Sequence, residues 1–231
     1  MAVGRRFAPQ MAPGVFIGLL LSACVFGGST PTPHASCPSA APTAEQATTI
    51  LAGASDAVVQ TNKGSFTITL AGDKAPIATA NFVALARCGY YDGITFHRVI
   101  EGFVIQAGDP QTKKNRGVFN GLGSGGPGYK FPIETPGPGS TYDKYMVAMA
   151  NAAPAIPDSN GSQFFVDLAD LPQLPPSYTI FGKVTDGTSV VDAIGQVPTN
   201  GTPDGEPQNV PLDPVVIQSI TVQASAQPSQ V

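Results

Sequence analysis

From about residue 57 to residue 222 the chain alternates short apolar runs with turns rich in Gly, Pro and Asn, a pattern typical of many short β-strands. The runs at 58–61 and 65–70 flank an Asn-Lys-Gly turn and predict a strand-turn-strand unit. Further strands are expected within 95–109 and over 145–150, 163–166, 178–184 and 215–222. Apolar residues at helical spacing predict helices over 77–88 and 186–196. Many short strands with two separated helices favour a mainly β fold, an antiparallel barrel that closes on itself and leaves no edges.

One cation interrupts the apolar pattern of the 95–109 stretch. With the two-residue period of a strand, Arg98 shares a face with Phe96 and Ile100. Gln106 lies on the returning segment, where its amide could hydrogen-bond the guanidinium, fix its rotamer and leave other donors free for a ligand. An Arg paired with a carboxylate is an equally good interpretation of these residues alone.

A second stretch, 146–166, reads MVAMANAAPAIPDSNGSQFFV and gives the first one a context. The motifs FHR, GF, QAGD, MAN, GSQFF and FGKV occur in an order that closely resembles the cyclophilin family of peptidyl-prolyl isomerases, over about residues 57 to 222. The resemblance implies a closed eight-stranded antiparallel β-barrel capped by two α-helices, one at each end. It also implies an enzyme that accelerates rotation about X-Pro bonds in unfolded or extended, proline-containing polypeptides.

The resemblance also assigns a site, residue by residue. Arg98 and Gln106 match the catalytic positions, and Gln163 matches a polar residue that orients Arg98 and the substrate. The other matches are Phe103, Val104, Phe165 and Leu174 in the proline pocket, Ala150 and Asn151 in the segment that pairs with the substrate backbone, and Tyr178 as an aromatic wall. Simple core packing is the alternative for each aromatic residue. The glycine-rich loop at 123–126 is expected to border the groove, and the extra length at 113–120 has no assigned role.

Three positions depart from the pattern common in the family. Gln173 stands where many cyclophilins have Trp, and the chain contains no Trp at all. Tyr178 stands where they have His, and it still offers an aromatic wall and a hydroxyl group. Val104 replaces the commoner Met and narrows one wall of the pocket. Turnover is therefore expected, whereas loss of the indole donor argues against tight cyclosporin binding.

The chemistry asked of such a site is rotation without bond making. Twisting an X-Pro bond abandons amide resonance against a barrier of about 18 to 20 kcal/mol. The prolyl nitrogen gains a lone pair as it twists, so a donor aimed at that lone pair or at the carbonyl oxygen stabilises only the twisted state. The permanently charged guanidinium of Arg98 suits this role. No nucleophile or cofactor is needed, and with only His34 and His97 in the chain no spaced Cys/His set indicates a metal site.

The N-terminal segment has the pattern of a bacterial export signal. Arg5 and Arg6 precede a short apolar run at 15–23, and Leu-Ser-Ala-Cys at 21–24 matches the lipobox of lipoproteins. We expect residues 1–23 to be a signal peptide, Cys24 to be lipidated, and the protein to be anchored on the extracytoplasmic face of a cell membrane. An ordinary cleaved secretory signal is the alternative.

The remaining organisation follows from composition and charge. Residues 24–53 contain few large apolar side chains and predict a disordered tether, although 44–51 could form a short helix; the isomerase domain is expected over 54–225, with a flexible tail at 226–231. Cys37 and Cys88 either form a disulfide or remain free thiols. With 231 residues, a net charge of −4 and a pI near 5.0, we expect a monomer that does not bind nucleic acid.

Two other classes of function stay open on the sequence. A proline-peptide-binding or chaperone module with little turnover is compatible with the changes at Gln173 and Tyr178. A purely structural envelope lipoprotein predicts no groove. The Gly-rich stretch at 123–128 is not a phosphate loop, because no Lys-Ser/Thr follows it and the next residues do not open a helix.

Overall fold

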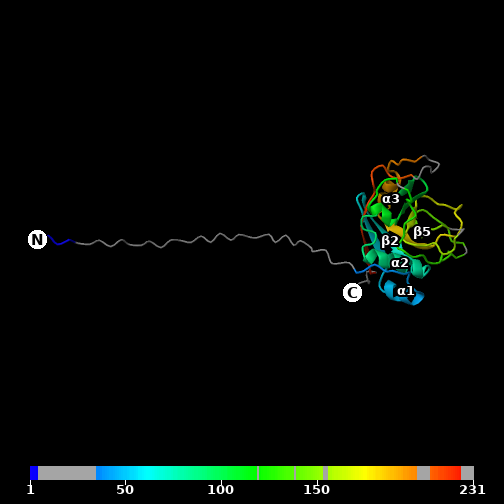
Figure 1. Cartoon of the computed structure of the whole chain (residues 1–231), viewed down its shortest axis with the longest axis horizontal. Coiled ribbons are helices and arrows are strands. Elements are labelled where there is room, and N and C mark those ends of the chain that lie inside the picture. The colour runs from blue at the N-terminus through cyan, green and yellow to red at the C-terminus, as the bar shows by residue number, and fades with distance from the viewer. Residues whose placement is uncertain (5–34, 119, 138, 153–155, 202–208, 225–231) are drawn as a thin grey trace, which may run out of the picture. The chain divides into compact units, whose positions relative to one another are not determined.

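The computed structural model describes residues 1–4, 35–118, 120–137, 139–152, 156–201 and 209–224. The chain divides into two units, Met1–Pro33 and His34–Val231, and the fold below is that of the second. Its described part holds eight antiparallel strands in one sheet (Figure 1). The strands are β1(Asp56–Thr61), β2(Gly64–Leu70), β3(Arg98–Ile100), β4(Val104–Ala107), β5(Met146–Met149), β6(Phe164–Asp167), β7(Ile180–Asp186) and β8(Ile217–Gln223).

The sheet is curled but it is not the closed barrel that we predicted. Its strand order is β3-β4-β6-β5-β7-β2-β1-β8, so that β3 and β8 are edge strands without a ladder between them. The residues just before β3 do bond to the chain at the start of β8, through the bridge of Thr95 with Val216 and neighbouring backbone hydrogen bonds. The outer edge of β3 itself bonds to a loop and not to β8, since Val99 N donates to Asn209 O at 2.9 Å. In this strand of three residues, the outward N–H of Val99 is therefore not available for a closing ladder with β8.

Three α-helices accompany the sheet, one more than the two caps that we expected. The predicted caps are α2(Pro76–Arg87) and α3(Thr188–Gly195), and a short 3₁₀ helix, η1(Pro110–Lys113), follows β4. Helix α2 begins with a proline, and the Glu134 carboxylate accepts hydrogen bonds from Ile77 N at 2.9 Å and Ala78 N at 2.7 Å. These contacts satisfy two of the amides that every helix leaves open at its N-terminus.

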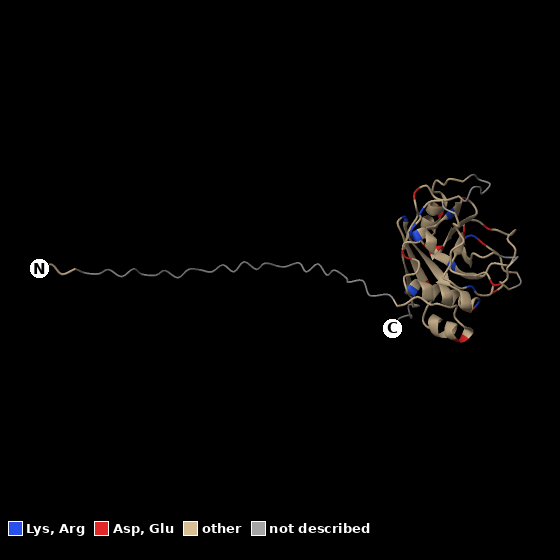
Figure 2. Ribbon diagram, in the orientation of Figure 1, with Lys and Arg blue, Asp and Glu red and all other residues tan. Residues whose placement is uncertain are grey.

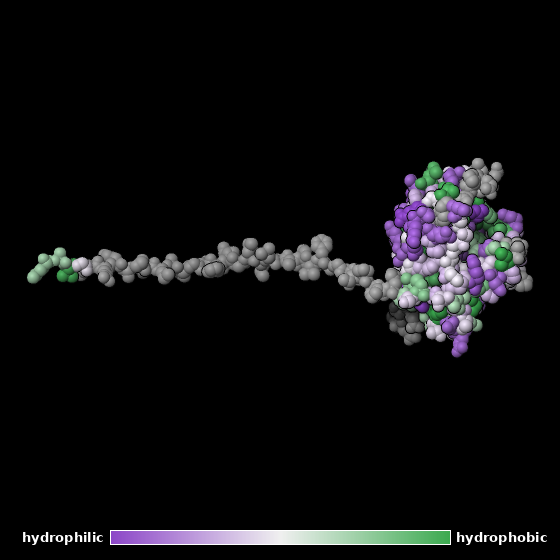
Figure 3. All heavy atoms as spheres, viewed as in Figure 1, coloured by the Kyte–Doolittle hydropathy of each residue, from purple (hydrophilic) through white to green (hydrophobic). Residues whose placement is uncertain are grey.

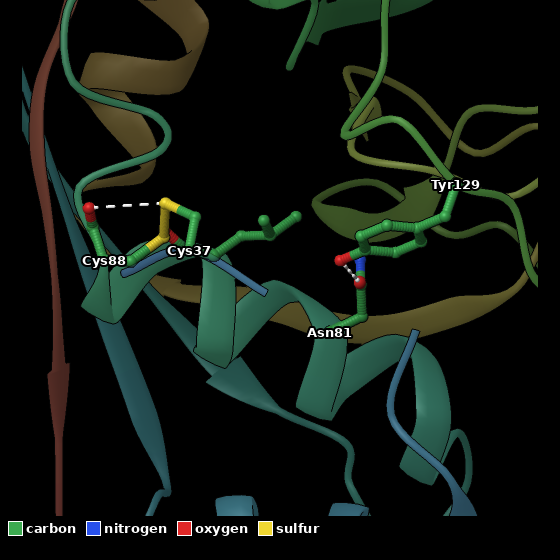
Figure 4. The surroundings of a disulfide bond; sticks show 5 residues. Cys37, Asn81, Cys88 and Tyr129 are labelled. Atoms are coloured by element: carbon green, nitrogen blue, oxygen red, sulfur yellow. Dashed lines mark hydrogen bonds between the residues drawn. A yellow bond between two sulfur atoms is a disulfide. The ribbon is translucent and has the colours of Figure 1, made fainter. Parts of the chain in front are cut away.

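The third helix, α1(Ala44–Leu51), lies in the segment that we expected to be a disordered tether over 24–53. The structure has the short helix that we named as an option over 44–51, whereas a disordered tether does not describe residues 35–53, because three contacts offset the scarcity of apolar side chains. Thr43 and Gln46 form a capping box, Arg87 Nη1 donates to Ile50 O at 2.7 Å, and a disulfide joins Cys37 to Cys88 at the end of α2 (Figure 4). Of the two alternatives that the sequence left open, the structure has the Cys37–Cys88 disulfide and not two free thiols. Residues 24–34, with Cys24, and the expected tail at 226–231 lie outside the described residues.

Alternation along β6 divides the apolar side chains into two clusters. Phe164 and Val166 face the main core, where the Phe164 ring lies 5.6 Å from that of Phe82 on α2 and the Phe82 ring lies 4.9 Å from that of Phe181 on β7. Phe165 faces the opposite way and joins a smaller cluster with Val104, Tyr142, Ala148 and Leu171. The second cluster places apolar side chains on the outer face of the sheet, where a ligand can reach them.

The surface of the His34–Val231 unit carries charges of both signs. Lys and Arg lie interspersed with Asp and Glu over the face in Figure 2, and hydrophilic and apolar residues alternate over the same face in Figure 3. Among the described residues, no helix is long and apolar enough to cross a membrane.

Candidate functional site

A cavity of about 200 Å³ opens over the outer cluster. It is lined by residues of β3, β4 and β6 and of the loops after β5 and before β7, namely Arg98, Phe103, Val104, Gln106, Ala150, Asn151, Phe165, Leu174 and Tyr178. Every site residue that we predicted within the described chain lies on this cavity except Gln163, which is adjacent to it. That these residues bind and turn over a substrate stays a prediction.

The floor and one wall of the cavity are apolar and held from behind. Val104 and Phe165 are 2% and 5% exposed, and the Phe165 ring meets the Tyr178 ring edge-on with centroids 5.5 Å apart. Tyr142 fixes this wall from outside the cavity. Its hydroxyl donates to Tyr178 O at 2.9 Å and accepts from Tyr178 N at 3.1 Å. Tyr178 therefore occupies the place of the usual His as a braced aromatic wall.

Arg98 is the cation of this cavity. It begins β3, stands opposite Gln106 in the strand register and is half-buried. Its guanidinium carbon lies 5.6 Å from the centroid of the Phe103 ring, within the range of a cation–π contact. The guanidinium is thus placed beside an apolar surface, where the low local dielectric strengthens its action on a ligand.

Gln106 and Gln163 form an ordered pair of amides. Gln106 Nε2 donates to Gln163 Oε1 at 3.0 Å, and Gln163 Nε2 donates to the carbonyl oxygens of Gly123 at 2.7 Å and Gly125 at 2.8 Å. A role of Gln106 in orienting Arg98 stays a prediction. The glycine loop at 123–126, which we expected at the groove, is linked to β4 through these two side chains.

A second cavity of about 330 Å³ adjoins the first and shares Gln106, Ala150 and Asn151 with it. Gly123, Gly125 and Gln163 line it, together with the exposed Lys130. The two cavities therefore form one continuous surface over β4 and the loop after β5.

Several residues that support the site were not found from the sequence. Ser162 Oγ donates to Gly108 O at 2.7 Å, and Asn81 Nδ2 on α2 donates to Gly161 O at 2.9 Å. Tyr129 in turn donates to Asn81 Oδ1 at 2.7 Å (Figure 4). These bonds fix the backbone just before Gln163. The two residues joined by each of these bonds lie 48 to 80 positions apart in the sequence, so no local pattern could have indicated the bonds.

Two buried titratable groups flank the site. Asp167 is 0% exposed behind Phe165 and, within the described chain, neither of its carboxylate oxygens has a hydrogen-bond partner. Burial, reinforced by the charge of Asp143, raises the pKa of Asp167 to about 8. Burial likewise lowers the pKa of His97, next to Arg98, to about 4. Both side chains are therefore neutral at pH 7.

We expect the Asp167→Asn substitution to remove a loss of stability at alkaline pH. The unfolded chain releases the Asp167 proton near pH 3.8 and the folded chain near pH 8, so stability falls as pH rises between these values. His97 has the opposite sign, because the unfolded chain takes up a proton near pH 6.5 and the folded chain only near pH 4. The two contributions to the pH dependence of the unfolding free energy cancel between pH 4 and 6.5. From pH 6.5 to 8 only that of Asp167 acts, and the unfolding free energy falls by about 2 kcal/mol.

Urea unfolding over a series of pH values measures this effect. The unfolding free energy of Asp167→Asn should not change with pH above 6.5. Below pH 6.5 it should decrease as the pH falls, because the destabilising effect of His97 is no longer offset by Asp167. Asp186→Asn removes an exposed carboxylate and should keep the wild-type profile. A profile of Asp167→Asn that still falls above pH 6.5 means that another group is responsible.

The arrangement defines a class of protein. Within the described residues no group of His, Cys, Asp and Glu could hold a metal ion. A cavity with an apolar floor and a guanidinium on its rim, on the outer face of a curled eight-stranded sheet, is the arrangement of a prolyl isomerase.

Comparison with known proteins identifies the family. The model of the cyclophilin type peptidyl-prolyl cis-trans isomerase/CLD family matches residues 57–222. The chain belongs to this family, and its activity is peptidyl-prolyl cis-trans isomerisation. It is 44% identical over 184 residues to a probable peptidyl-prolyl cis-trans isomerase A of Mycobacterium bovis, covering 72% of this chain and 91% of that protein. It is 42% identical to peptidyl-prolyl cis-trans isomerase B of Streptomyces anulatus, covering 72% and 95%.

Solved structures agree with the assignment. A crystal structure of a Cryptosporidium parvum cyclophilin type peptidyl-prolyl cis-trans isomerase superposes with a TM-score of 0.64 at 33% identity, covering 76% of this chain and 99% of that one. A second structure of that protein, in the presence of the dipeptide Ala-Pro, superposes with a TM-score of 0.63 at 34% identity, covering 73% and 99%.

Proposed function

We propose that the 200 Å³ cavity receives the proline ring of an extended polypeptide and that Arg98 stabilises the twisted X-Pro amide. The observation that carries this proposal is the guanidinium of Arg98 beside the Phe103 ring on the wall of the same cavity. Contact with Phe165 and Val104 holds the proline ring, which contributes on the order of 1 to 3 kcal/mol by burial of apolar surface. The other side of the bond is left to rotate.

The rate acceleration comes from binding the twisted state better than either planar state. A planar amide delocalises its nitrogen lone pair and offers little to a donor at nitrogen. The twisted amide localises that lone pair, and a fixed guanidinium in a partly buried site then gains a hydrogen bond that neither ground state makes. The main chain of Ala150 and Asn151, on the same cavity, supplies the edge on which the substrate backbone is held.

A proline-isomer assay tests this function directly. Wild-type protein is expected to accelerate isomerisation of an Ala-Pro peptide in proportion to enzyme concentration. The competing function is a proline-binding module, which is favoured by Gln173 and Tyr178, the departures from the family pattern. Peptide binding by equilibrium titration without any acceleration would favour that module and reject the enzyme mechanism.

We also propose that the protein works outside the cytoplasm, anchored to a membrane through a lipid on Cys24, as a monomer that assists exported polypeptides. The lipobox at 21–24 supports the anchor. The Cys37–Cys88 disulfide supports export, because such bonds form and persist in oxidising compartments. Anchoring close to the site of export places the isomerase where newly translocated chains are still extended.

Mass spectrometry of the mature N-terminus checks the anchor. We expect a diacylglyceryl-modified Cys24 as the first residue, and accumulation of the uncleaved precursor when Cys24 is replaced by Ser. A mature protein that begins beyond Cys24 and carries no lipid would instead establish an ordinary secretory signal. Cys37→Ser leaves the lipobox intact and serves as the control.

A further inference from the structure

Asp109 is not among the residues that line either cavity, yet it binds the glycine loop at 123–126, which lines the second cavity. It is separated from the end of β4 by Gly108 alone, is 0% exposed and is the N-cap residue of helix η1. Its Oδ1 accepts a hydrogen bond from Gln111 N at 2.8 Å. Its Oδ2 accepts from Gly123 N at 2.7 Å and from Gly125 N at 3.3 Å. The carboxylate of Asp109 thus accepts hydrogen bonds from backbone N–H groups of η1 and of the glycine loop.

The same two glycines are bound from the other side by Gln163. Asp109 takes their amide groups, and Gln163 Nε2 takes both of their carbonyl oxygens. The glycine loop is therefore held between a fixed anion and a fixed amide. A side chain at position 125 would collide with Asp109 Oδ1, which explains the glycine there.

This arrangement determines which way the amide of Gln106 points. A primary amide has two N–H protons, and Gln163 uses both on the loop, so its Nε2 must face the loop and its acceptor Oε1 must face Gln106. Gln106 must then donate through Nε2, as the structure has it. The Oε1 of Gln106 is left as the acceptor on the cavity that it shares with Arg98. An acceptor there suits a guanidinium or a substrate N–H, whereas a flipped amide would present donors to a cation.

We propose that Asp109 is a positioning residue for the isomerisation, which acts through the glycine loop and Gln163 to fix the amide orientation of Gln106. The inference rests on the proposed role of the cavity and deepens it. If the loop loses its anion, its carbonyl groups are no longer held for Gln163, and both amides can rotate. Substrate binding by the apolar pocket persists, so the expected loss is in kcat rather than in KM.

A double-mutant cycle tests the proposal, with kcat and KM measured for each variant in the proline-isomer assay. Asp109→Asn keeps the size of the side chain but removes the charge, and it should lower kcat about tenfold with KM within about twofold. In a Gln106→Ala background the same substitution should change kcat by less than about twofold, because the group on which it acts is absent. Asp213→Asn, the loss of an exposed carboxylate, should leave kcat unchanged in both backgrounds.

The cycle separates positioning from stability. Equal effects of Asp109→Asn in both backgrounds, or no effect in either, overturn the proposal. If Asp109→Asn does not fold, Gly125→Ala replaces it, because the added methyl group displaces the carboxylate while leaving its charge. It should show the same dependence on Gln106. Failure of the proposed function has a different signature, since the wild-type protein itself would then give no acceleration.

Discussion

Replacement of Arg98 by Ala is expected to lower kcat/KM for an Ala-Pro peptide by about 10²- to 10³-fold, the usual effect of removing one preorganised donor from a developing charge. The cause is loss of the guanidinium from the wall that it shares with Phe103 and Phe165. Those two rings remain, so the dissociation constant of the peptide should change by less than about fivefold. Exchange spectroscopy of the two isomers measures the rate, and an equilibrium titration measures the affinity.

Two variants control this experiment. Arg98→Lys keeps the charge but loses the forked donors, and it should recover only part of the rate. Lys183→Ala removes an exposed cation from β7 and should behave as wild type, which excludes an effect of net charge. Undiminished turnover in Arg98→Ala would show that the guanidinium does not contribute to the barrier and that the mechanism lies elsewhere in the cavity.

Removing the Cys37–Cys88 disulfide is expected to cost roughly 4 kcal/mol of unfolding free energy. The bond closes a loop over a sequence separation of 51 residues, and the chain-entropy model assigns about this much to a loop of that length. The loop contains α1, β1, β2 and the whole of α2. Urea unfolding of the Cys37→Ser/Cys88→Ser variant measures the loss.

The wild-type protein under reducing conditions should lose about the same free energy, which ties the effect to the bond and not to the serines. We expect kcat at room temperature to stay within about twofold of wild type, since the lining of the proline cavity comes from β3, β4, β6 and the loops beside β5 and β7. A stability difference below about 1 kcal/mol would mean that the bond does not constrain the unfolded chain in solution.

The sequence went far toward the site because the family motifs are local. FHR, GF, QAGD, MAN and GSQFF carry six of the nine residues that line the cavity. The predicted shared face of Phe96, Arg98 and Ile100 was wrong, because β3 begins only at Arg98 and Phe96 packs in the main core instead. Strand and helix positions also followed from period and turn residues, which report short-range geometry. The family, and with it the isomerase activity, follows from these same motifs.

Local patterns could not predict that the sheet stays open or which contacts order residues 35–53. Both depend on contacts between residues far apart in the chain. Val99 N donates to Asn209 O and not to a β8 partner, and Cys37 is bonded to Cys88 at the end of α2, 51 residues further along the chain. Local composition correctly described the 35–53 segment as poor in core residues but could not supply the disulfide that holds it.

By itself, then, the sequence determined the family, the strand pattern and the identity of the cation and apolar residues around the cavity. Only the tertiary structure decided how those side chains are aimed. The amide of Gln106 is oriented by Gln163, the glycine loop and Asp109, and Tyr178 is braced by Tyr142. The orientation of these side chains depends on which neighbouring donors and acceptors already have partners. Those partners come from distant segments of the chain, so they are known only from the tertiary structure.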